Sequence, residues 1–257
     1  MARLGIQLIV FGKRAGEDLP GVLRDVKAAG YDGAEIGNPA AQENKSAADV
    51  KALFDDAGLA CSGYHTGFNA FSDHDLLART ADHMNVVGAR YLMCSGTAGR
   101  DRDGYLRSAE TFNAAGSLLQ KRGVSLCYHN HNWEFFPLDN NEKGLFLLAD
   151  NTDPALVKLC VDVYWVACAG EDPAAFVRRY ANRAVYFHYK DGTFDAAAQQ
   201  PQTFTELGNG QVDLKAAHLA VLAQNPEWIV TEQDKTEREP AESARISADY
   251  ARRELGI

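Results

Sequence analysis

A repeated unit runs through the first half of the chain, in which a helical stretch ends at a glycine and a short apolar run follows at once. The unit recurs at Ala29-Gly30-Tyr31, Ala57-Gly58-Leu59, Val87-Gly88-Ala89 and Arg122-Gly123-Val124. Glycine can take the left-handed conformation that ends a helix, after which the chain turns back into a strand. Helices that alternate with strands in this way predict a parallel sheet covered by helices.

Eight strands are predicted, and their number and spacing decide between the parallel architectures. The expected strands are Leu4–Phe11, Gly33–Gly37, Ala60–Tyr64, Tyr91–Cys94, Ser125–His129, Val157–Val163, Val185–Tyr189 and Trp228–Thr231. The amphipathic stretches between them include Leu19–Ala29, Leu76–Val87, Tyr105–Lys121, Pro173–Tyr180 and Leu214–Gln224, with a weakly marked helix over Lys143–Asp150. Eight units at roughly 30-residue spacing fit a closed (β/α)8 TIM barrel better than an open sheet. No Pro/Ser-rich linker or low-complexity tract interrupts the chain, so we expect a single domain over residues 1–257.

The charge balance limits the classes of partner. The formal net charge is −9 at pH 7, and the sequence pI is about 5.3. Binding along a nucleic-acid backbone needs a concentrated basic surface, so nucleic acid is not an expected partner. No apolar run approaches the roughly 20 residues of a membrane-spanning helix, so no membrane partner is expected either. The composition is typical of a soluble enzyme with a small-molecule substrate, and it leaves a homo-oligomer open.

The cysteines and the first residues favour a cytoplasmic location. The cysteines are odd in number, form no C-x-x-C pair and lie mostly in apolar runs; they are Cys61, Cys94, Cys127, Cys160 and Cys168. We expect them to be reduced core residues. The opening residues are only briefly apolar and lack a small-residue cleavage pattern, so they are interpreted as the first strand and not as a signal peptide.

Metal-capable side chains occur at the ends of the last four predicted strands. They are His129, His131 and Glu134 at the fifth, Asp162 in the sixth, His188 in the seventh and Glu232 at the eighth. Functional side chains of TIM barrels lie at these C-terminal strand ends. Adjacent strands are about 4.8 Å apart, so side chains from neighbouring strands can converge on one metal ion. The residues predict one divalent-metal site and leave open whether His129 or His131 is a ligand.

Each position also has a structural interpretation. Asp162 could instead cap a helix or pair with an arginine, because an unpaired carboxylate costs several kcal/mol to bury. A lone His188 would more often be a core histidine, and its companions favour ligation. The histidines on helical stretches, which are His74, His83 and His218, are expected at the surface.

Five segments carry a resemblance to a known family. They are Tyr-His-Asn-His-Asn-Trp-Glu-Phe (128–135), Val-Asp-Val-Tyr-Trp (161–165), His-Tyr-Lys-Asp (188–191), Leu-Gly-Asn-Gly-Gln-Val-Asp (207–213) and Val-Thr-Glu-Gln-Asp (230–234). With Leu-Gly-Ile-Gln-Leu (4–8) and Asp-Gly-Ala-Glu-Ile (32–36), the likeness spans essentially the whole chain. The chain resembles the xylose-isomerase-like TIM-barrel superfamily of sugar phosphate isomerases and epimerases and of keto-sugar dehydratases. The motif set is specific for the superfamily and much less so for one reaction.

The resemblance implies one divalent metal held by a Glu, an Asp, a His and a second Glu from the last four strands. Carried over, the last three fall on Asp162, His188 and Glu232, whereas the first falls on His129. The two glutamates of the sugar epimerases also move protons on opposite faces of the substrate, so His129 argues against a symmetrical two-carboxylate mechanism. A neutral imidazole binds metal well. Mn²⁺ is the expected ion, with Co²⁺, Mg²⁺ or Zn²⁺ as alternatives for a mixed N/O site.

Weaker candidates lie around these residues. His65, Lys190 and Glu134 are candidate substrate contacts, and each has a structural alternative. Glu35 could line the barrel mouth or bond to backbone. The Gly208-x-Gly210 turn is interpreted as loop geometry, because it does not follow a strand as a phosphate cradle does. Residues 192–213 are the expected long active-site loop.

The expected reaction is metal-assisted proton transfer next to the carbonyl of a sugar or keto-sugar. The metal would stabilise an enediolate, with Glu232, or His131 with Glu134, as base and acid. Return of the proton to carbon makes the enzyme an isomerase or epimerase, which is the first expectation. Loss of a β-hydroxyl or glycosyl group from a keto-sugar or keto-inositol makes it a dehydratase or lyase, which is the alternative.

Two further classes remain as minor alternatives. A sugar-binding protein without catalysis would bind keto-sugars and leave the α-proton unexchanged. A DNA-repair enzyme of the AP-endonuclease type would need several more metal ligands and a basic surface, which the net charge of −9 and the seven histidines disfavour.

Overall fold

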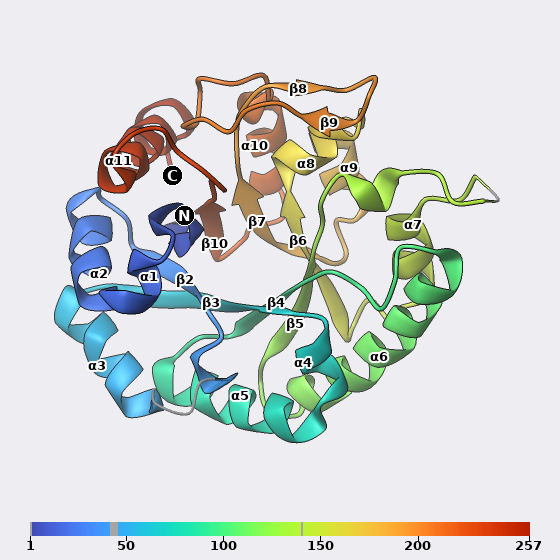
Figure 1. Cartoon of the computed structure of the whole chain (residues 1–257), viewed down its shortest axis with the longest axis horizontal. Helices are drawn as coiled ribbons and strands as arrows, with labels where there is room; N and C mark the ends of the chain where they lie inside the picture. Colours follow the sequence, from blue (N-terminus) through green and yellow to red (C-terminus); the bar gives the residue numbers. More distant parts are fainter. Residues whose placement is uncertain (1, 42–45, 140) are drawn as a thin grey trace.

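The computed structural model describes residues 2–41, 46–139 and 141–257. Within these residues, eight parallel strands close into a barrel with helices around it (Figure 1). The barrel strands are β1 (Arg3–Gln7), β2 (Gly33–Gly37), β3 (Ala60–Gly67), β4 (Tyr91–Ser95), β5 (Ser125–His129), β6 (Val157–Asp162), β7 (Ala184–Tyr189) and β10 (Trp228–Thr231). β1 pairs in parallel with both β2 and β10, which closes the ring. The TIM-barrel prediction is confirmed.

Helices follow the strands and cover the outside of the barrel (Figure 1). They are α1 (Arg14–Glu17), α2 (Leu19–Ala28), α3 (Ala47–Ala57), α4 (Asn69–Ser72), α5 (His74–Val87), α6 (Arg102–Gln120), α7 (Gly144–Asp150), α8 (Val163–Cys168), α9 (Pro173–Arg179), α10 (Leu214–Leu222) and α11 (Pro240–Tyr250). Short turns of other helical types lie at η1 (Leu8–Phe11), η2 (Pro39–Ala41), η3 (Trp133–Phe135) and η4 (Ala251–Leu255). α3 and α5 end at Gly58 and Gly88, whose φ angles of 63° and 91° are the left-handed values that the glycine-ended units predict.

Bulky side chains fill the inside of the barrel below the strand ends. The buried cluster there consists of Met93, Cys127, Cys160, Tyr186, Trp228 and Val230. The packing leaves no room for a side chain at Gly33, where a Cβ would lie 2.6 Å from the Trp228 ring. The barrel is therefore a packed core and not a pore, and it leaves only its C-terminal mouth for chemistry.

Two local expectations were wrong. Leu8–Phe11 was expected to continue the first strand, but β1 ends at Gln7, whose side chain accepts a hydrogen bond from the Ile9 N–H and starts the turn η1. His218 was expected at the surface, but it is buried on the inner face of α10 and its Nδ1 lies 2.9 Å from the Tyr189 hydroxyl. His83 is half-buried and bonds to the Tyr64 hydroxyl, so of the three helical histidines only His74 is exposed.

The cysteines are confirmed as core residues: all five are buried and unpaired. Among the described residues, no helix has the length and apolar character needed to cross a membrane.

The long loop after β7 is held at its base by one carboxylate. Asp191 Oδ2 accepts hydrogen bonds from the N–H groups of Gly208 and Gly210, at 2.9 and 3.1 Å. Its Oδ1 accepts from Gly192 and Val212, at 2.9 and 3.2 Å. Burial raises the pKa of Asp191, and these four bonds oppose the rise. The N–H groups of the Gly208-x-Gly210 turn thus bind the Asp191 side chain of the same loop, which agrees with the interpretation of this turn as loop geometry. The tip carries a small antiparallel pair, β8 (Phe194–Asp195) and β9 (Gln200–Pro201).

Candidate metal centre

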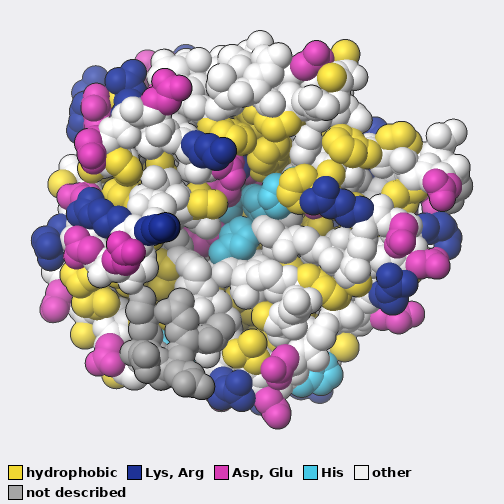
Figure 2. Space-filling view, viewed as in Figure 1, with side chains coloured by type: hydrophobic (Ala, Val, Ile, Leu, Met, Phe, Trp, Pro, Cys, Tyr) yellow, Lys and Arg dark blue, Asp and Glu magenta, His cyan; other side chains and the backbone are white. Residues whose placement is uncertain are grey.

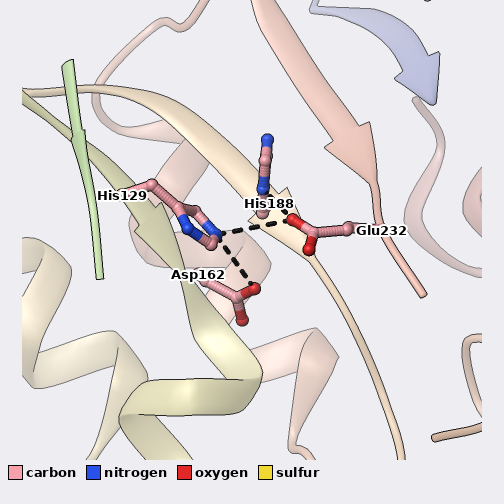
Figure 3. A group of neighbouring side chains, drawn as sticks. All are labelled: His129, Asp162, His188 and Glu232. Carbon is pink, nitrogen blue, oxygen red and sulfur yellow. Dashed lines mark hydrogen bonds and ion pairs between the residues drawn. The ribbon is translucent and has the colours of Figure 1, made fainter. Parts of the chain in front are cut away.

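Four buried side chains meet at the C-terminal mouth of the barrel (Figure 3). His129 ends β5, Asp162 ends β6, His188 lies near the end of β7 and Glu232 directly follows β10. Each offers one ligand atom, and these atoms all lie within 4.8 Å of one another. The strand register explains part of this closeness, because Asp162 and His188 are direct partners across β6 and β7. Two imidazoles and two carboxylates in such a cluster could hold a divalent metal ion.

The contacts inside the cluster are typical of atoms that share a cation. His129 Nε2 lies 3.4 Å from both Asp162 Oδ2 and Glu232 Oε2. His188 Nδ1 contacts Glu232 Oε2, yet neither atom has a hydrogen-bond partner and both are buried. Leaving a buried polar atom unsatisfied costs roughly 1–3 kcal/mol. A metal ion bound between these atoms would remove that cost, so the residues fit such a group.

Asp162 combines the two roles that the sequence left as alternatives. Its Oδ1 accepts hydrogen bonds from the N–H groups of Tyr164 and Trp165, at 3.0 and 3.1 Å, and so caps α8. Its Oδ2 faces His129. The side chain of Asn130 bonds to both the N–H and the carbonyl of Asp162 and holds its backbone in place. The helix cap therefore fixes the direction in which Asp162 Oδ2 points.

Lys190 supplies a buried positive charge beside the cluster. Its Nζ lies 3.0 Å from Glu232 Oε1, 3.4 Å from Asp162 Oδ2 and 2.8 Å from Asp234 Oδ2. Burial lowers the pKa of Lys190, but the three carboxylates outweigh burial and raise it above its usual value. For Glu232, burial raises the pKa, and Lys190 together with His188 and His129 lowers it well below the usual range. Lys190 thus stabilises the ionised carboxylates that a metal needs.

A second group of polar side chains lies against the two histidines of the cluster. Glu35, on β2, is fully buried; its Oε2 lies 2.8 Å from His188 Nε2 and its Oε1 lies 2.7 Å from His65 Nδ1. His65 Nε2 lies 2.5 Å from Ser95 Oγ, which lies 3.0 Å from His129 Nδ1. Burial raises the pKa of Glu35, and the imidazoles of His188 and His65 outweigh burial and bring it to about 2. Both ring nitrogens of His65 are therefore engaged within the protein.

His131 lies beside the cluster but outside it. Its ring stacks on Trp133 at 3.8 Å between centroids and 14° between planes, and lies 4.8 Å from the His129 ring. Its Nδ1 is buried, has no hydrogen-bond partner and lies 3.7 Å from Glu134 Oε1. Burial lowers the pKa of His131. Glu134 is fully buried and accepts from the Tyr128 hydroxyl at 2.7 Å and from the His131 N–H at 2.8 Å.

Comparison with known proteins places this geometry in a family. The family model described as the xylose isomerase-like TIM barrel matches residues 23–254, which is most of the chain. The chain belongs to the xylose isomerase-like TIM-barrel family. The resemblance inferred from the strand-end motifs is confirmed.

Within the family, the chain is similar in sequence to inosose dehydratases. It is 23% identical to that of Clostridium perfringens over 275 residues, covering 91% of this chain and 89% of the relative. It is 30% identical to that of Lactiplantibacillus plantarum over 159 residues, covering 56% of this chain and 52% of the relative. This second match therefore spans about half the length of that protein.

Solved structures share the fold along the whole chain. A sugar phosphate isomerase/epimerase of Parabacteroides distasonis superposes with a TM-score of 0.81 at 22% identity, covering 97% of this chain and 93% of that one. The IOLI protein, whose structure holds a zinc atom, superposes with a TM-score of 0.77 at 13% identity, covering 99% and 98%. At these identities, the likeness shows the fold alone.

Sequence reasoning missed Ser95 and Asp234 as parts of the site of this family member. Ser95 is the last residue of β4 and the direct register partner of His129 on β5. The rule that function gathers at strand ends includes this position, but a serine there carries no signal of its own. Asp234 stands two residues after Glu232 in a segment that was recognised, and only the fold shows that it reaches Lys190.

Proposed function

We propose that this protein is a divalent-metal-dependent lyase that removes a β-hydroxyl or glycosyl group from a keto-sugar or keto-inositol, as a dehydratase does. The observation that carries the proposal is the surroundings of His129, at the position where the resemblance expects a glutamate. Its Nε2 faces Asp162 and Glu232, and its Nδ1 lies 3.0 Å from Ser95 Oγ. With one nitrogen on a metal and the other bonded to serine, the ring has no atom left to exchange a proton with a substrate.

This loss separates the two candidate reactions. Epimerisation needs one group to remove the α-proton and a second to return it from the opposite face. Elimination needs one group to take the α-proton while the β C–O bond breaks, a C=C bond forms and the leaving oxygen receives a proton. A site that lacks its second carboxylate therefore favours elimination. When bound, a divalent ion supplies the Lewis acidity that polarises the substrate carbonyl.

Among the candidate proton carriers, His131 is the best placed. Its Nδ1 has no partner in the protein, and stacking on Trp133 fixes the plane of the ring. Glu232 is the alternative base, but its Oε1 is paired with Lys190 at 3.0 Å and a carboxylate with such a lowered pKa is a weak base. Glu134 would orient His131, since hydrogen bonds within the protein already engage its two oxygens.

The surroundings of the cluster suit a small hydroxylated molecule. Figure 2 shows histidine side chains at the floor of the hollow in the centre of this face. A hollow of about 800 Å³ lies between the long loop and the segment that follows Glu232, with Gln202, Thr205, Gln233 and Lys235 among the residues that line it. Phe204 also lines this hollow, and its ring lies 5.6 Å from Lys190 Nζ. We propose Lys190 as a contact for substrate hydroxyl or carbonyl oxygens. His65, the other candidate, has both ring nitrogens engaged by Glu35 and Ser95, so we do not propose it as a substrate contact.

Isomerisation or epimerisation is the second candidate. His131 and Glu232 follow β5 and β10, which β6 and β7 separate in the ring, so the two side chains approach the cluster from different sides. Acting as an acid and base pair, they could serve two faces of a substrate. The pairing of Glu232 with Lys190 makes this arrangement the weaker one.

One experiment distinguishes the candidates. The purified protein, loaded with Mn²⁺, is incubated in D₂O with a panel of keto-inositols, keto-sugars and 3-keto-glucosides, and the products are followed by NMR. A lyase gives an unsaturated keto product together with released water or alcohol. An epimerase gives deuterium at the α-carbon and an epimer, without elimination. If a panel member binds tightly but shows neither elimination nor deuterium incorporation, both enzyme candidates are contradicted, and the result supports a sugar-binding protein without catalysis.

A further inference from the structure

Five side chains form an unbroken chain of contacts that links the two histidines of the metal centre. It runs from His188 to Glu35, His65, Ser95 and His129, with successive donor–acceptor distances of 2.8, 2.7, 2.5 and 3.0 Å. Ser95 and His129 are register partners on β4 and β5, whereas Glu35 reaches His188 across the inside of the barrel, from β2 to β7. This series of contacts therefore depends on the tertiary fold and not on one local motif.

Hydrogen-bond chemistry assigns a direction to this chain. An ionised carboxylate can only accept hydrogen bonds, so the Glu35 oxygens accept from His188 Nε2–H and His65 Nδ1–H. His65 Nε2 then carries no proton and accepts a hydrogen bond from the Ser95 hydroxyl. Ser95 Oγ in turn accepts from His129 Nδ1–H. Every proton thus points toward Glu35.

In the neutral imidazoles that bind a metal ion, this direction leaves one particular nitrogen of each of the two histidines without a proton. His188 keeps the lone pair on Nδ1, the atom that contacts Glu232 Oε2. His129 keeps the lone pair on Nε2, the atom 3.4 Å from Asp162 Oδ2 and Glu232 Oε2. These are the lone pairs that point into the cluster.

We propose that Glu35 sets the tautomer and ring orientation of both metal-site histidines, of His188 directly and of His129 through His65 and Ser95. Glu35, His65 and Ser95 are positioning residues, which act on the metal through the two histidines. Partners of this kind raise metal affinity, and their loss typically costs about 10- to 100-fold in affinity. The inference concerns the metal centre and not the reaction, so it stands or falls separately from the proposed elimination.

From Glu35, this series of contacts has two arms, one to His188 and one through His65 and Ser95 to His129, and substitutions can test the two arms separately. Ser95→Ala removes only the His129 arm, whereas Glu35→Gln changes the acceptor shared by both arms. Ser95→Thr keeps a hydroxyl and is the conservative variant. Thr97→Val is the matched control: it removes a hydroxyl from the same strand-end segment, where Thr97 bonds to the Gly99 carbonyl.

Zinc is the probe, and its affinity is measured by competition with a chromophoric chelator in the full-length protein. We expect about 10-fold weaker binding for Ser95→Ala and up to about 100-fold weaker binding for Glu35→Gln. Ser95→Thr and Thr97→Val should bind as the wild type does. The visible absorption band of the Co²⁺ form should shift in Ser95→Ala and stay unchanged in Thr97→Val. Wild-type zinc affinity in both Ser95→Ala and Glu35→Gln would overturn the proposal.

A measurement on the wild type covers the case in which Glu35→Gln does not fold. In ¹⁵N-histidine NMR spectra of the zinc-loaded protein, His65 should carry its proton on Nδ1, with Nε2 as an acceptor. A proton on His65 Nε2 would reverse the chain at its centre and refute the assignment.

Discussion

Lys190 Nζ lies 3.0 Å from Glu232 Oε1, while the other oxygen of Glu232 faces the histidines of the metal centre. One carboxylate thus joins a buried ammonium to the place where a metal cation would bind. The Lys190 ammonium and a bound metal ion would interact with the same two carboxylates, since Lys190 also lies 3.4 Å from Asp162 Oδ2. The stability of the protein without metal and its affinity for metal are therefore coupled.

Lys190→Met should expose this coupling. Removing one partner of a buried ion pair typically costs about 3–5 kcal/mol, so the metal-free variant should lose that much unfolding free energy. Saturating Mn²⁺ should stabilise the variant more than it stabilises the wild type, because the ion replaces part of the lost charge. Urea unfolding with and without Mn²⁺ measures both effects. Lys215→Met, which removes an exposed pair with Glu254, is the control and should leave the unfolding free energy almost unchanged, because solvent screens exposed ion pairs. A metal-free Lys190→Met protein as stable as the wild type would contradict the coupling.

Metal content tests the cluster itself. The wild type should carry close to one divalent ion per chain, and Glu232→Ala and Asp162→Asn should lose most of it. Asn at position 162 keeps an oxygen that can cap α8, so the fold should survive. Elemental analysis after dialysis measures the content. The control is Asp172→Asn, which alters the cap of α9 and an exposed contact with Arg178, away from the cluster. Three zinc ions per chain would rule out a single-metal centre.

His129 and His131 should have different roles. His129→Ala should lose metal sharply, because Nε2 of this ring lies among the other ligand atoms. His131→Ala should keep its metal and lower the rate of elimination by at least about 10²-fold, the lower end for loss of a general base. Metal analysis and NMR assays of the unsaturated product, made on the same samples, separate the two roles. If His131→Ala eliminates at the wild-type rate, Glu232 becomes the candidate base, and Glu232→Gln should then lower that rate by a similar factor.

The buried His218 should make stability depend on pH. Burial lowers its pKa in the folded protein, so on acidification the unfolded chain binds the proton first. Its contribution is fully present above the ordinary histidine pKa of about 6.5 and is lost as the pH falls below that value. Urea unfolding at pH 8 and pH 5.5 should show a smaller pH dependence in His218→Gln than in the wild type. The exposed His74→Gln should leave the dependence unchanged, and an unchanged dependence in His218→Gln would contradict the prediction.

The sequence predicted the barrel and the cluster because both follow from short-range signals. Gly58 and Gly88 ended helices where glycine was expected, and Asp162 and Glu232 stood out as carboxylates in or beside apolar strands. The end of β1 was missed because Leu8–Phe11 is as apolar as a strand. In the structure, the Gln7 side chain accepts a hydrogen bond from the Ile9 N–H and caps the turn η1, in which the backbone leaves the sheet.

The chain of positioning residues could not be predicted, because it depends on register. The pairing of β2 with β3 shifts between Ala34 and Glu35, which sets Glu35 opposite Gly63. Such a shift leaves no mark in the sequence. Ser95 is likewise an ordinary strand-end serine until β4 and β5 are aligned and His129 is found beside it.

Asp191 holds the root of the long loop, whereas the tip is held by other contacts: the Gln199 carbonyl accepts from Asn132, and the Gln199 side chain donates to the Ala169 carbonyl. The four backbone hydrogen bonds of Asp191 end at Gly192, Gly208, Gly210 and Val212, so residues 194–201 lie outside the part that it holds. Sequence change in that tip need not move Lys190 or His188 on the preceding strand end. The root differs from the tip in this respect, because Asp191 directly follows Lys190 along the chain, and a change at this carboxylate should reach the side chains around the candidate metal centre.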